Sequence, residues 1–401
     1  MNLSKLSSDS GRSKATNPLS LIWIAVAGLA IIVGGILIST ITPLIFPTQG
    51  SAEAQQIDAL FQFLLAIGGM IFLLVQGVLL YSAIRFRARP GDHADGPPIQ
   101  GNTTLEFVWT VIPAIIVVII TIYAYQVWVS IQSIKPNEQL VEAVGLRFAW
   151  VFNYTVPEEE LPADLDREAL PANVLASLNN NGFITFSSPQ LHTWVGQPVH
   201  VRMRTEDVNH AFWIPGMRVK QDLLAGRTTD IRFTPIEPGV YRIVCAELCG
   251  SGHGNMAGEV SANGDLIGAW LIVHQDEEAF LREFLIPERD AVLFPPADPA
   301  LRGRLVINNY ACAGCHVLDD LGWVGITGPS LNGIASRTQR LAAGGYSTME
   351  EYIYRSIRYP GEYLVPGYGN IMPAFNPEPG QPNYMPEEDL EAIVAYLLTQ
   401  E

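Results

Sequence analysis

Two short segments of the chain concentrate the side chains that bind soft metals and haem. Residues 245–256, CAELCGSGHGNM, contain two cysteines, a histidine and a methionine, and residues 312–316, CAGCH, contain the other two cysteines of the 401 residues. Thiolate, imidazole and thioether groups suit copper, zinc and iron better than magnesium or calcium. Both segments are therefore candidate metal or cofactor sites, and the rest of the chain must position them.

The spacing of CAGCH is typical of covalent haem attachment. In a C-x-x-C-H motif, Cys312 and Cys315 would form thioethers with the haem vinyl groups, and His316 would be the proximal iron ligand. The alternatives are a redox disulfide or half of a zinc site. Zinc would need a second pair of ligands, and residues 317–401 contain no further Cys or His.

A methionine downstream of this motif would supply the sixth iron ligand, as in cytochromes with Met/His ligation. Met372 lies in GYGNIMPAF, a Gly/Pro-rich segment that cannot be helical, and it precedes an amphipathic run at 386–398. Met372 is therefore predicted to be the axial ligand, ahead of the other candidates, Met349 and Met385.

The first segment suits copper. Cys245 and Cys249 follow a strand-like alternation of apolar and polar residues, so the ligands would lie on the loop after a strand. A blue-copper site needs one cysteine and two histidines. Two cysteines indicate instead two metals bridged by both sulfurs, with His253 on one metal, His210 on the other, and Met256 nearby. A disulfide with surface histidines, or a mononuclear metal carrier, remains an alternative.

Three long apolar runs, at 18–46, 57–84 and 107–129, each exceed the roughly 20 residues that a membrane-spanning helix requires. Basic residues precede the first run and follow the second. The positive-inside rule places both of these ends in the cytoplasm, and everything after about residue 132 outside. The first run is either a signal sequence cut after SAEA at 51–54 or a retained anchor, and its length favours an anchor.

The charge is as uneven as the hydropathy. The net charge of −16 comes from residue 133 onward, because the first 132 residues hold six basic and six acidic side chains. Nucleic acid is a poor candidate partner, because phosphate binding requires a basic face. A basic protein docking on an acidic surface is an open alternative to acidity that serves solubility alone.

The copper segment and its surroundings resemble a known family. DVNHAFWIPGMRVKQD at 207–222, followed by CAELCGSGHGNM, resembles the dinuclear CuA motif of cytochrome c oxidase subunit II, and LEFVWTVIPAII at 105–116 is similar to the start of that subunit's second helix. The resemblance covers roughly residues 57–401. It implies that the side chains of His210, Cys245, Cys249, His253 and Met256 bind CuA.

The same resemblance implies roles for two glutamates. Glu247 would bind copper through its backbone carbonyl, and its carboxylate would face a magnesium shared with subunit I. Glu106 would lie at the mouth of a proton pathway into subunit I, and the alternative is a carboxylate that stabilises a helix N-terminus. The remaining histidines, His93, His192, His200 and His274, match no site and are expected to be structural or at the surface.

Residues 298–401 resemble a small class I cytochrome c throughout. Gly303 opens the helix before the haem motif, TGPSLNGIASR at 327–337 matches the family's proline-bearing loop, and the MP that begins at Met372 supplies the axial sulfur. By this resemblance, the carbonyl of Pro329 would hold the ring N–H of His316. Fusion of a CuA subunit to a cytochrome c is the arrangement of the caa-type haem–copper oxidases.

One departure from the family concerns the aromatic cluster through which an external cytochrome c sends electrons to CuA. In LRFAWVFNY at 146–154, Phe148 takes the place of the tryptophan that receives the electron, and Ala149 that of its aromatic neighbour. This change predicts that electrons reach CuA only from the tethered haem.

The predicted fold is a membrane-anchored multidomain protein. It combines an N-terminal hydrophobic helix, a transmembrane helical hairpin, a cupredoxin-like Greek-key β-sandwich with a polar, Pro-rich surface excursion at 155–190, and an all-α cytochrome c domain. The predicted boundaries are 1–54 for the cytoplasmic N-terminus and anchor or signal, 55–132 for the hairpin, 133–275 for the CuA domain, 276–297 for a linker and 298–401 for the cytochrome domain.

The implied function is that of subunit II of a proton-pumping cytochrome c oxidase. Electrons would pass from haem c to CuA and on to the haem–copper centre of subunit I, which reduces dioxygen to water. The implied partners are subunit I, subunit III, the membrane and an external donor such as a cytochrome c or small copper protein. The expected location is the bacterial plasma membrane, multi-pass, with both cofactor domains on the periplasmic face. A nitrogen-oxide reductase subunit and a membrane-bound copper chaperone are the alternatives.

Overall fold

The structure, a computed structural model, describes residues 18–87, 91, 101–260, 264, 266–378, 381 and 383–401. The chain divides into two compact units. The first comprises Met1–Phe46 and Ile57–Val127, and the second comprises Pro47–Gln56 and Trp128–Glu401. His93 and the basic residues before the first apolar run lie outside the described residues.

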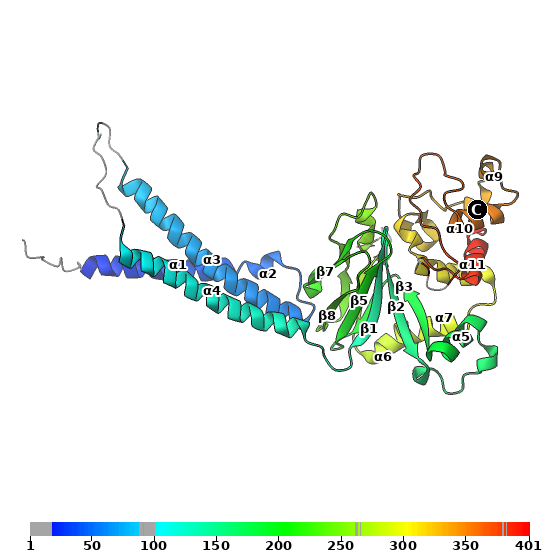
Figure 1. Ribbon diagram of the computed structural model, residues 1–401, viewed down its shortest axis with the longest axis horizontal. Helices are drawn as coiled ribbons and strands as arrows, with labels where there is room; N and C mark the ends of the chain where they lie inside the picture. The colour runs from blue at the N-terminus through cyan, green and yellow to red at the C-terminus, as the bar shows by residue number, and fades with distance from the viewer. Residues whose placement is uncertain are drawn as a thin grey trace, which may run out of the picture. The chain divides into compact units, whose positions relative to one another are not determined.

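Three long helices form the first unit (Figure 1): α1 (Pro18–Ser39), α3 (Ala52–Arg85) and α4 (Thr103–Gln132), with the short α2 (Thr42–Ile45) after α1. All three have the length and hydropathy to cross a membrane. The helix α1 approaches α3 closely at Gly35, where a Cβ would overlap Met70. Between α3 and α4, the rings of Phe63 and Tyr123 meet edge to face with centroids 5.5 Å apart.

The core of the second unit is a β-sandwich. Its largest sheet has the strand order β3-β2-β1-β5-β8, and two three-stranded sheets have the orders β10-β6-β7 and β4-β13-β9. The alternation of side chains across a strand places Val199, Val201 and Met203 of β5 in the core while their neighbours face outward. The strands are β1 (Gln139–Leu146), β2 (Ala149–Pro157), β3 (Phe183–Ser188), β4 (Leu191–Trp194), β5 (Val199–Thr205), β6 (His210–Ile214), β7 (Val219–Leu223), β8 (Thr229–Phe233), β9 (Gly239–Arg242), β10 (Val244–Cys245) and β13 (Trp270–His274).

The segment 155–190 is not only a surface excursion. It adds the edge strand β3 to the large sheet, in antiparallel register with β2. The helix α5 (Ala172–Asn181) buries Val174 and Leu178, which are four residues apart and so share one helix face. The prediction underestimated this segment because its many polar and proline residues hide a short amphipathic helix.

The segment predicted as a linker is mostly helical and belongs to the sandwich core. It contains α6 (Glu277–Phe280), a π-helical turn (Leu281–Leu285) and α7 (Ile286–Leu293). Phe280 and Phe284, four residues apart, are each only 3% exposed, and the ring of Phe284 packs on Tyr154 of β2. Only residues 294–298 separate α7 from the first helix of the C-terminal domain. The C-terminal domain is therefore attached by a short connection rather than a long tether.

Residues around the expected boundary at 54 also pack on the sandwich. Gly50 N–H donates to the carbonyl of Gly216, and Ala52 N–H donates to that of Thr234. Glu53, 3% exposed, accepts from the backbone N–H of Thr234 and pairs with Lys135. The expected boundary therefore falls inside α3, within a stretch whose backbone and side chains complete the sandwich.

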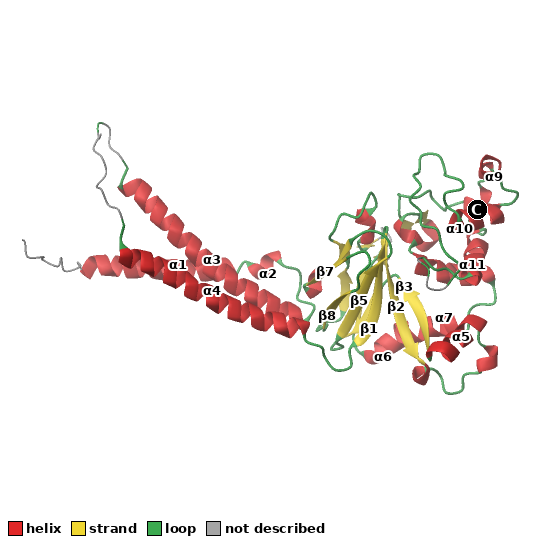
Figure 2. Cartoon of the chain, in the orientation of Figure 1, coloured by secondary structure: helices red, strands yellow, loops and turns green. Residues whose placement is uncertain are grey.

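The C-terminal domain is built from helices and loops (Figure 2), apart from the two-residue strands β14 (Val317–Leu318) and β15 (Trp323–Val324). Its α-helices are α8 (Pro299–Val306), α9 (Gln339–Gly344), α10 (Met349–Arg358) and α11 (Glu387–Leu397). Gly303 lies inside α8 rather than at its start. A Cβ there would overlap the backbone carbonyl of Ala392, so this glycine allows α8 and α11 to cross closely.

Candidate functional site

Strand pairing brings the separated copper-ligand candidates together. His210 is the first residue of β6, and Cys245 is the last residue of β10, which pairs with β6 so that Cys245 lies opposite Phe212. The chain then forms a loop that contains Cys249 and ends in a 3₁₀ turn, His253–Met256. Residues 35 positions apart in sequence therefore meet at one end of the sandwich.

The predicted copper donors form one connected cluster of contacts. The donor atoms of His210, Cys245 and Cys249 are all within 4.8 Å of one another. The sulfur of Cys245 is 3.9 Å from Nδ1 of His210 and 3.2 Å from the backbone carbonyl oxygen of Glu247. The sulfur of Cys249 is 3.5 Å from Nδ1 of His253 and 3.4 Å from the sulfur of Met256. Each cysteine thus contacts one histidine and one further donor.

Burial and charge make this cluster costly without a cation. Burial raises the pKa of the Cys249 thiol to about 12, with the Cys245 thiolate as the second cause. Burial also acts to raise the pKa of Cys245, but hydrogen bonds from His210 and two backbone groups lower it overall. Two thiolates this close cannot both ionise without a compensating positive charge. Soft ligands held in a buried cluster fit copper, whose charge would stabilise both thiolates.

The candidate ligand His210 is oriented by a carboxylate that was not predicted from the sequence. Asp207 Oδ1 lies 2.9 Å from Nε2 of His210, so the other ring nitrogen, Nδ1, faces the cysteines. Asp207 also accepts from the backbone N–H of Arg147 at 2.8 Å and from its Nε at 3.2 Å. Carboxylates commonly fix ligand histidines in this way. An acidic residue three positions before a candidate ligand was the signal for it.

Trp150 of β2 supports the other side of the cluster. Its indole N–H donates to the carbonyl of Met256 at 3.1 Å, and its ring meets His210 edge to face with centroids 5.9 Å apart. Because Trp150 is 2% exposed, both contacts are fixed by the sandwich core.

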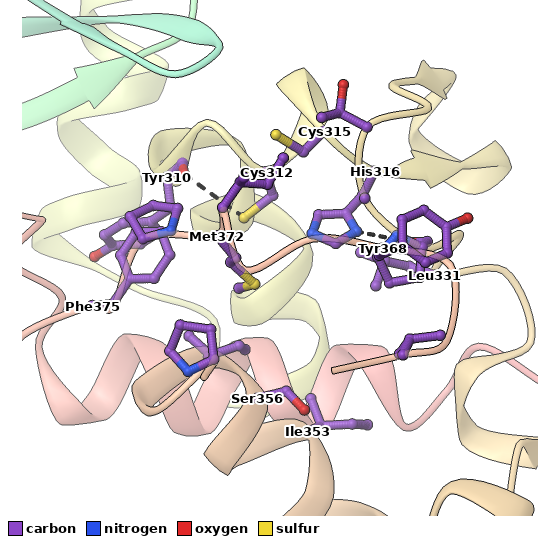
Figure 3. A pocket seen from close by; sticks show the side chains of 18 of the residues that line it. Tyr310, Cys312, Cys315, His316, Leu331, Ile353, Ser356, Tyr368, Met372 and Phe375 are labelled. Atoms are coloured by element: carbon purple, nitrogen blue, oxygen red, sulfur yellow. Dashed lines mark hydrogen bonds between the residues drawn. The ribbon is translucent and has the colours of Figure 1, made fainter. Parts of the chain in front are cut away.

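The CAGCH motif lines a pocket in the C-terminal domain (Figure 3). Ring atom Nδ1 of His316 lies 2.7 Å from the carbonyl oxygen of Pro329, which leaves Nε2 for an iron ligand. Gly328 packs on the His316 ring, where a Cβ would lie 2.8 Å from Cε1. Burial lowers the pKa of His316, so the ring stays neutral, as a ligand must.

Met372 is the methionine that the structure places with this motif. Figure 3 shows its side chain at the same pocket as Cys312 and His316. Met385 is instead a core residue, 1% exposed. The buried guanidinium of Arg358 donates at 2.9 Å to the carbonyls of both Phe375 and Met385, and so secures the segment that follows Met372.

The pocket wall also fits a haem. Most of the lining is apolar, but it includes Arg340, which is 8% exposed and donates to Tyr352 Oη at 3.1 Å. Among the described residues, no carboxylate pairs with this buried cation. A buried charge requires a partner, and the carboxylates of a haem would supply one. The sequence analysis missed Arg340, because nothing in its local pattern distinguishes a buried arginine from an exposed one.

The two predicted functional glutamates have different surroundings. The backbone carbonyl oxygen of Glu247 contacts the sulfur of Cys245, and the residue as a whole is exposed to solvent. Glu106 lies in the first turn of α4, where its Oε1 accepts from the backbone N–H of Asn102 at 3.1 Å. Asn102 in turn caps the N–H groups of Thr104 and Leu105. The geometry of Glu106 is therefore that of a helix-capping residue.

Three sequence families match the chain in order. Residues 39–127 match the transmembrane domain of cytochrome C oxidase subunit II, residues 139–262 match its periplasmic domain, and residues 300–401 match cytochrome c. The chain belongs to the cytochrome c oxidase subunit II family. As such it is a membrane-anchored component of a haem–copper oxidase, its partner is subunit I, and its copper and cytochrome domains imply copper and haem.

Relatives of this subunit II chain cover different parts of it. It is 32% identical over 259 residues to cytochrome c oxidase subunit 2 of Synechocystis, a match that covers 53% of this chain and 70% of the relative. It is 31% identical over 288 residues to that of Thermostichus vulcanus, with 65% and 83% covered. With the subunit of Alkalihalophilus pseudofirmus it is 28% identical over 335 residues, and 82% of each chain is covered.

Proposed function

We propose that this subunit II holds a dinuclear CuA and a covalently bound haem c, and that it conducts electrons from haem c through CuA to subunit I. When bound, the two groups supply one-electron carriers, and dioxygen is reduced to water in subunit I with proton pumping. The observation that carries the proposal is the geometry of the copper cluster, in which each of two buried cysteines has its own histidine Nδ1.

The proposed copper ligands are the side chains of His210, Cys245, Cys249, His253 and Met256 and the backbone carbonyl of Glu247. Their task is to hold their positions, because electron transfer is fast only where the ligands need not move. Pairing of β6 with β10, the Asp207 contact to His210 and the Trp150 contact to Met256 all serve this purpose.

The proposed haem ligands are Cys312 and Cys315 through thioether bonds and His316 and Met372 at the iron. Pro329 fixes the tautomer and orientation of His316 through the 2.7 Å contact. Raised thiol pKa values, to about 12 for Cys312 because of burial and the nearby Cys315, indicate that both sulfurs are protonated thiols before attachment. As thioethers they would have no proton to lose.

The surface beside the copper loop is proposed to face subunit I. Glu247 is exposed, which leaves its carboxylate free to bind a magnesium ion shared with that subunit. Leu248 next to it is 80% exposed, an apolar side chain that a partner would cover. We also assign subunit III and an external cytochrome c or small copper protein as partners, and a multi-pass location in a bacterial plasma membrane with both cofactor domains on the periplasmic face.

Glu106 is proposed as the carboxylate at the mouth of a proton pathway, in addition to its capping contact with Asn102. Glu106→Gln keeps a hydrogen-bond acceptor at the cap but cannot carry a proton. The expected result is slower steady-state oxygen consumption, with unchanged reduction of CuA and haem c. If Glu106→Gln and the wild type had the same turnover at every pH from 6 to 9, a range of about three decades in proton activity, Glu106 would act only as a helix cap.

Neither alternative function is favoured. A copper chaperone with C-x-x-x-C is expected to have a thioredoxin-like βαβ core, whereas this copper loop is mounted on a β-sandwich. A nitrogen-oxide reductase would share the sandwich, but the match to the oxidase transmembrane domain at 39–127 supports the oxygen-reducing family.

The test is to purify the complex from its native membrane and to measure its copper, haem and oxygen consumption. The expected result is two coppers and one thioether-linked haem c for each subunit II, with rapid oxygen uptake from a reduced donor. A complex that reduces nitrogen oxides but not oxygen would contradict the assignment, and so would one copper per chain.

A further inference from the structure

The copper loop and the haem motif touch directly within the second unit. Asn255 lies between the proposed ligands His253 and Met256, and its side-chain amide donates at 2.7 Å to the carbonyl of Gly314 and at 3.2 Å to Oγ1 of Thr327. Gly314 is the residue between Ala313 and Cys315 of the haem motif. One side chain of the copper loop thus bonds the haem-binding segment itself.

Both acceptors of Asn255 are tied to the haem ligands. Gly314 immediately precedes Cys315, and Thr327 immediately precedes Gly328, whose N–H donates at 2.7 Å to the carbonyl of Cys315. The next residue is Pro329, which holds His316. A shift of either acceptor would therefore move the attachment and the orientation of the haem.

Phe148 fills the remaining space between the two segments. It is 3% exposed, and a Cβ at Gly252 of the copper loop would overlap its ring. On its other side, a Cβ at Gly314 would overlap its backbone carbonyl. The absence of side chains at Gly252 and Gly314 therefore permits a close approach to the ring of Phe148 and to its backbone, respectively.

An apolar contact lies beside these polar ones. Ala311, just before the haem motif, packs against Val144, Leu146 and Val151 of the large sheet. Because only residues 294–298 connect the two domains after α7, the contact forms at high effective concentration.

We propose that Asn255 is a positioning residue for electron transfer between the domains: its two hydrogen bonds, together with the packing of Phe148 against Gly314, hold the C-terminal domain docked with its haem motif against the copper loop. This inference rests on the proposed function for its electron-transfer readout. A docked contact of this kind differs from a flexible tether, which only raises the local concentration of the haem. The docked contact requires one fixed geometry between the two domains.

The expected size of the effect follows from the two hydrogen bonds. Removing both hydrogen bonds should lower the equilibrium constant for docking by about 10- to 100-fold. A displacement of the order of 1 Å at a positioned site can cost a similar factor in rate.

The experiment uses the complete oxidase and the variant Asn255→Leu, which keeps the volume and removes the donors without adding charge. The control is Asn308→Leu, the same change on the C-terminal domain's wall of the cleft beside this contact. Three quantities are measured: the rate of electron transfer from photoreduced haem c to CuA at two solvent viscosities, hydrogen–deuterium exchange of residues 311–328, and the spectra and midpoint potentials of both centres.

In Asn255→Leu, electron transfer from haem c to CuA should be about 10- to 100-fold slower than in the wild type, and its rate should now fall as the viscosity increases. Hydrogen–deuterium exchange in 311–328 should be faster. The spectra and midpoint potentials of both centres should be unchanged. Asn308→Leu should resemble the wild type. Gly314→Ala should give the same results as Asn255→Leu, because the added methyl group would overlap the backbone carbonyl of Phe148. Ala313→Gly is the control for this variant.

An unchanged rate and exchange in Asn255→Leu would overturn the inference. A lower rate accompanied by an altered copper spectrum would also overturn it, because the residue would then act on the copper loop alone. If the wild type itself transfers no electron from haem c to CuA, the proposed function fails instead, and the exchange data still decide whether Asn255 holds the contact.

Discussion

The copper cluster and the haem pocket differ in what brings their donors together. In the copper cluster, hydrogen-bonded strands place His210 beside Cys245, and both cysteines, His210 and Met256 are less than 9% exposed. In the haem pocket, His316 and Met372 lie on loops that line a wide pocket. The candidate copper donors contact one another through the protein fold alone, whereas the two proposed iron ligands line a pocket that a haem would fill.

This difference indicates which of the two domains needs its cofactor in order to be stably folded. The β-sandwich has a continuous core of its own, so the copper-free domain should remain folded with its ligands in place. The C-terminal domain has a smaller core that borders an apolar pocket, so much of its stabilisation must come from the bound haem. Single substitutions at the two sites and in the sandwich sharpen this contrast.

Cys249→Ser should remove the copper pair. Both sulfurs are needed to hold two metals, so turnover should fall by more than the roughly 10- to 100-fold typical of changes outside the ligand set. Copper content, the CuA absorption and oxygen uptake measure the effect, and the haem c spectrum should stay intact. Glu247→Gln is the control for copper content and the CuA absorption, because only its backbone carbonyl is proposed to bind copper. A Cys249→Ser enzyme with two coppers would refute the assignment.

Met372→Leu should leave the haem attached but change its iron. The thioethers remain, yet loss of the sulfur ligand should lower the midpoint potential and open the iron to carbon monoxide, because Met/His ligation raises the potential of haem c. Redox titration and carbon monoxide binding measure both effects. Met349→Leu, outside the pocket, is the control. If Met349→Leu and not Met372→Leu produced this behaviour, the axial assignment would be wrong.

Asp207→Asn should weaken the copper site without abolishing it. The amide keeps the size of the side chain but loses the charge that orients Nε2 of His210 at 2.9 Å. We expect a loss of about 10-fold, and at most about 100-fold, in copper affinity. Competition with a copper chelator measures it, and Asp222→Asn on the exposed face of β7 is the control. Equal affinities for the two variants would mean that Asp207 does not support the ligand.

The smallest effect concerns His192 in the sandwich. Burial, and then the nearby His274, lower the pKa of His192 from 6.5 to about 3. The unfolded chain therefore binds a proton between these values that the folded chain does not, so the free energy of unfolding should fall as the pH decreases from about 6.5 towards 3. His192→Phe, which keeps the stacking on Phe284, should flatten this dependence.

Denaturant unfolding of the copper-free chain at pH 7 and pH 5 measures this effect, with the more exposed His200→Gln as the control. A slope that is identical in the wild type and in His192→Phe would assign the pH dependence to other groups.

The sequence predicted the parts of the fold that carry strong local signals. The apolar runs predicted α1, α3 and α4, and the alternating pattern before Cys245 predicted a strand that ends at the copper loop. The family resemblance, rather than local pattern, predicted the cupredoxin-like sandwich. The helix α5 was missed, and the segment of α7 was predicted as a linker, part helix and part Pro-rich, rather than as part of the core. The reason is that a few buried side chains within polar, proline-bearing segments give a weak signal.

The site was predicted to the extent that its residues carry chemistry themselves. For cysteine, histidine and methionine, the residue type and the spacing are enough to indicate a role as metal or haem ligands. The structure brings the predicted donors together. Arg340 and Asn255 contact partners 12 and 59 positions away in sequence, whereas Asp207 lies only three positions before His210. Aspartate, arginine and asparagine are common on surfaces, so only the three-dimensional structure reveals which of them is buried or paired.

The central claim is that electrons pass from the docked C-terminal domain to the copper cluster. The most direct measurement injects one electron photochemically into haem c of the complete oxidase without oxygen and follows both absorption spectra. The account predicts that haem c is reoxidised with the same rate constant as CuA is reduced, at a rate independent of protein concentration. Reduction of CuA before haem c, or a rate that increases with the concentration of protein, would contradict it.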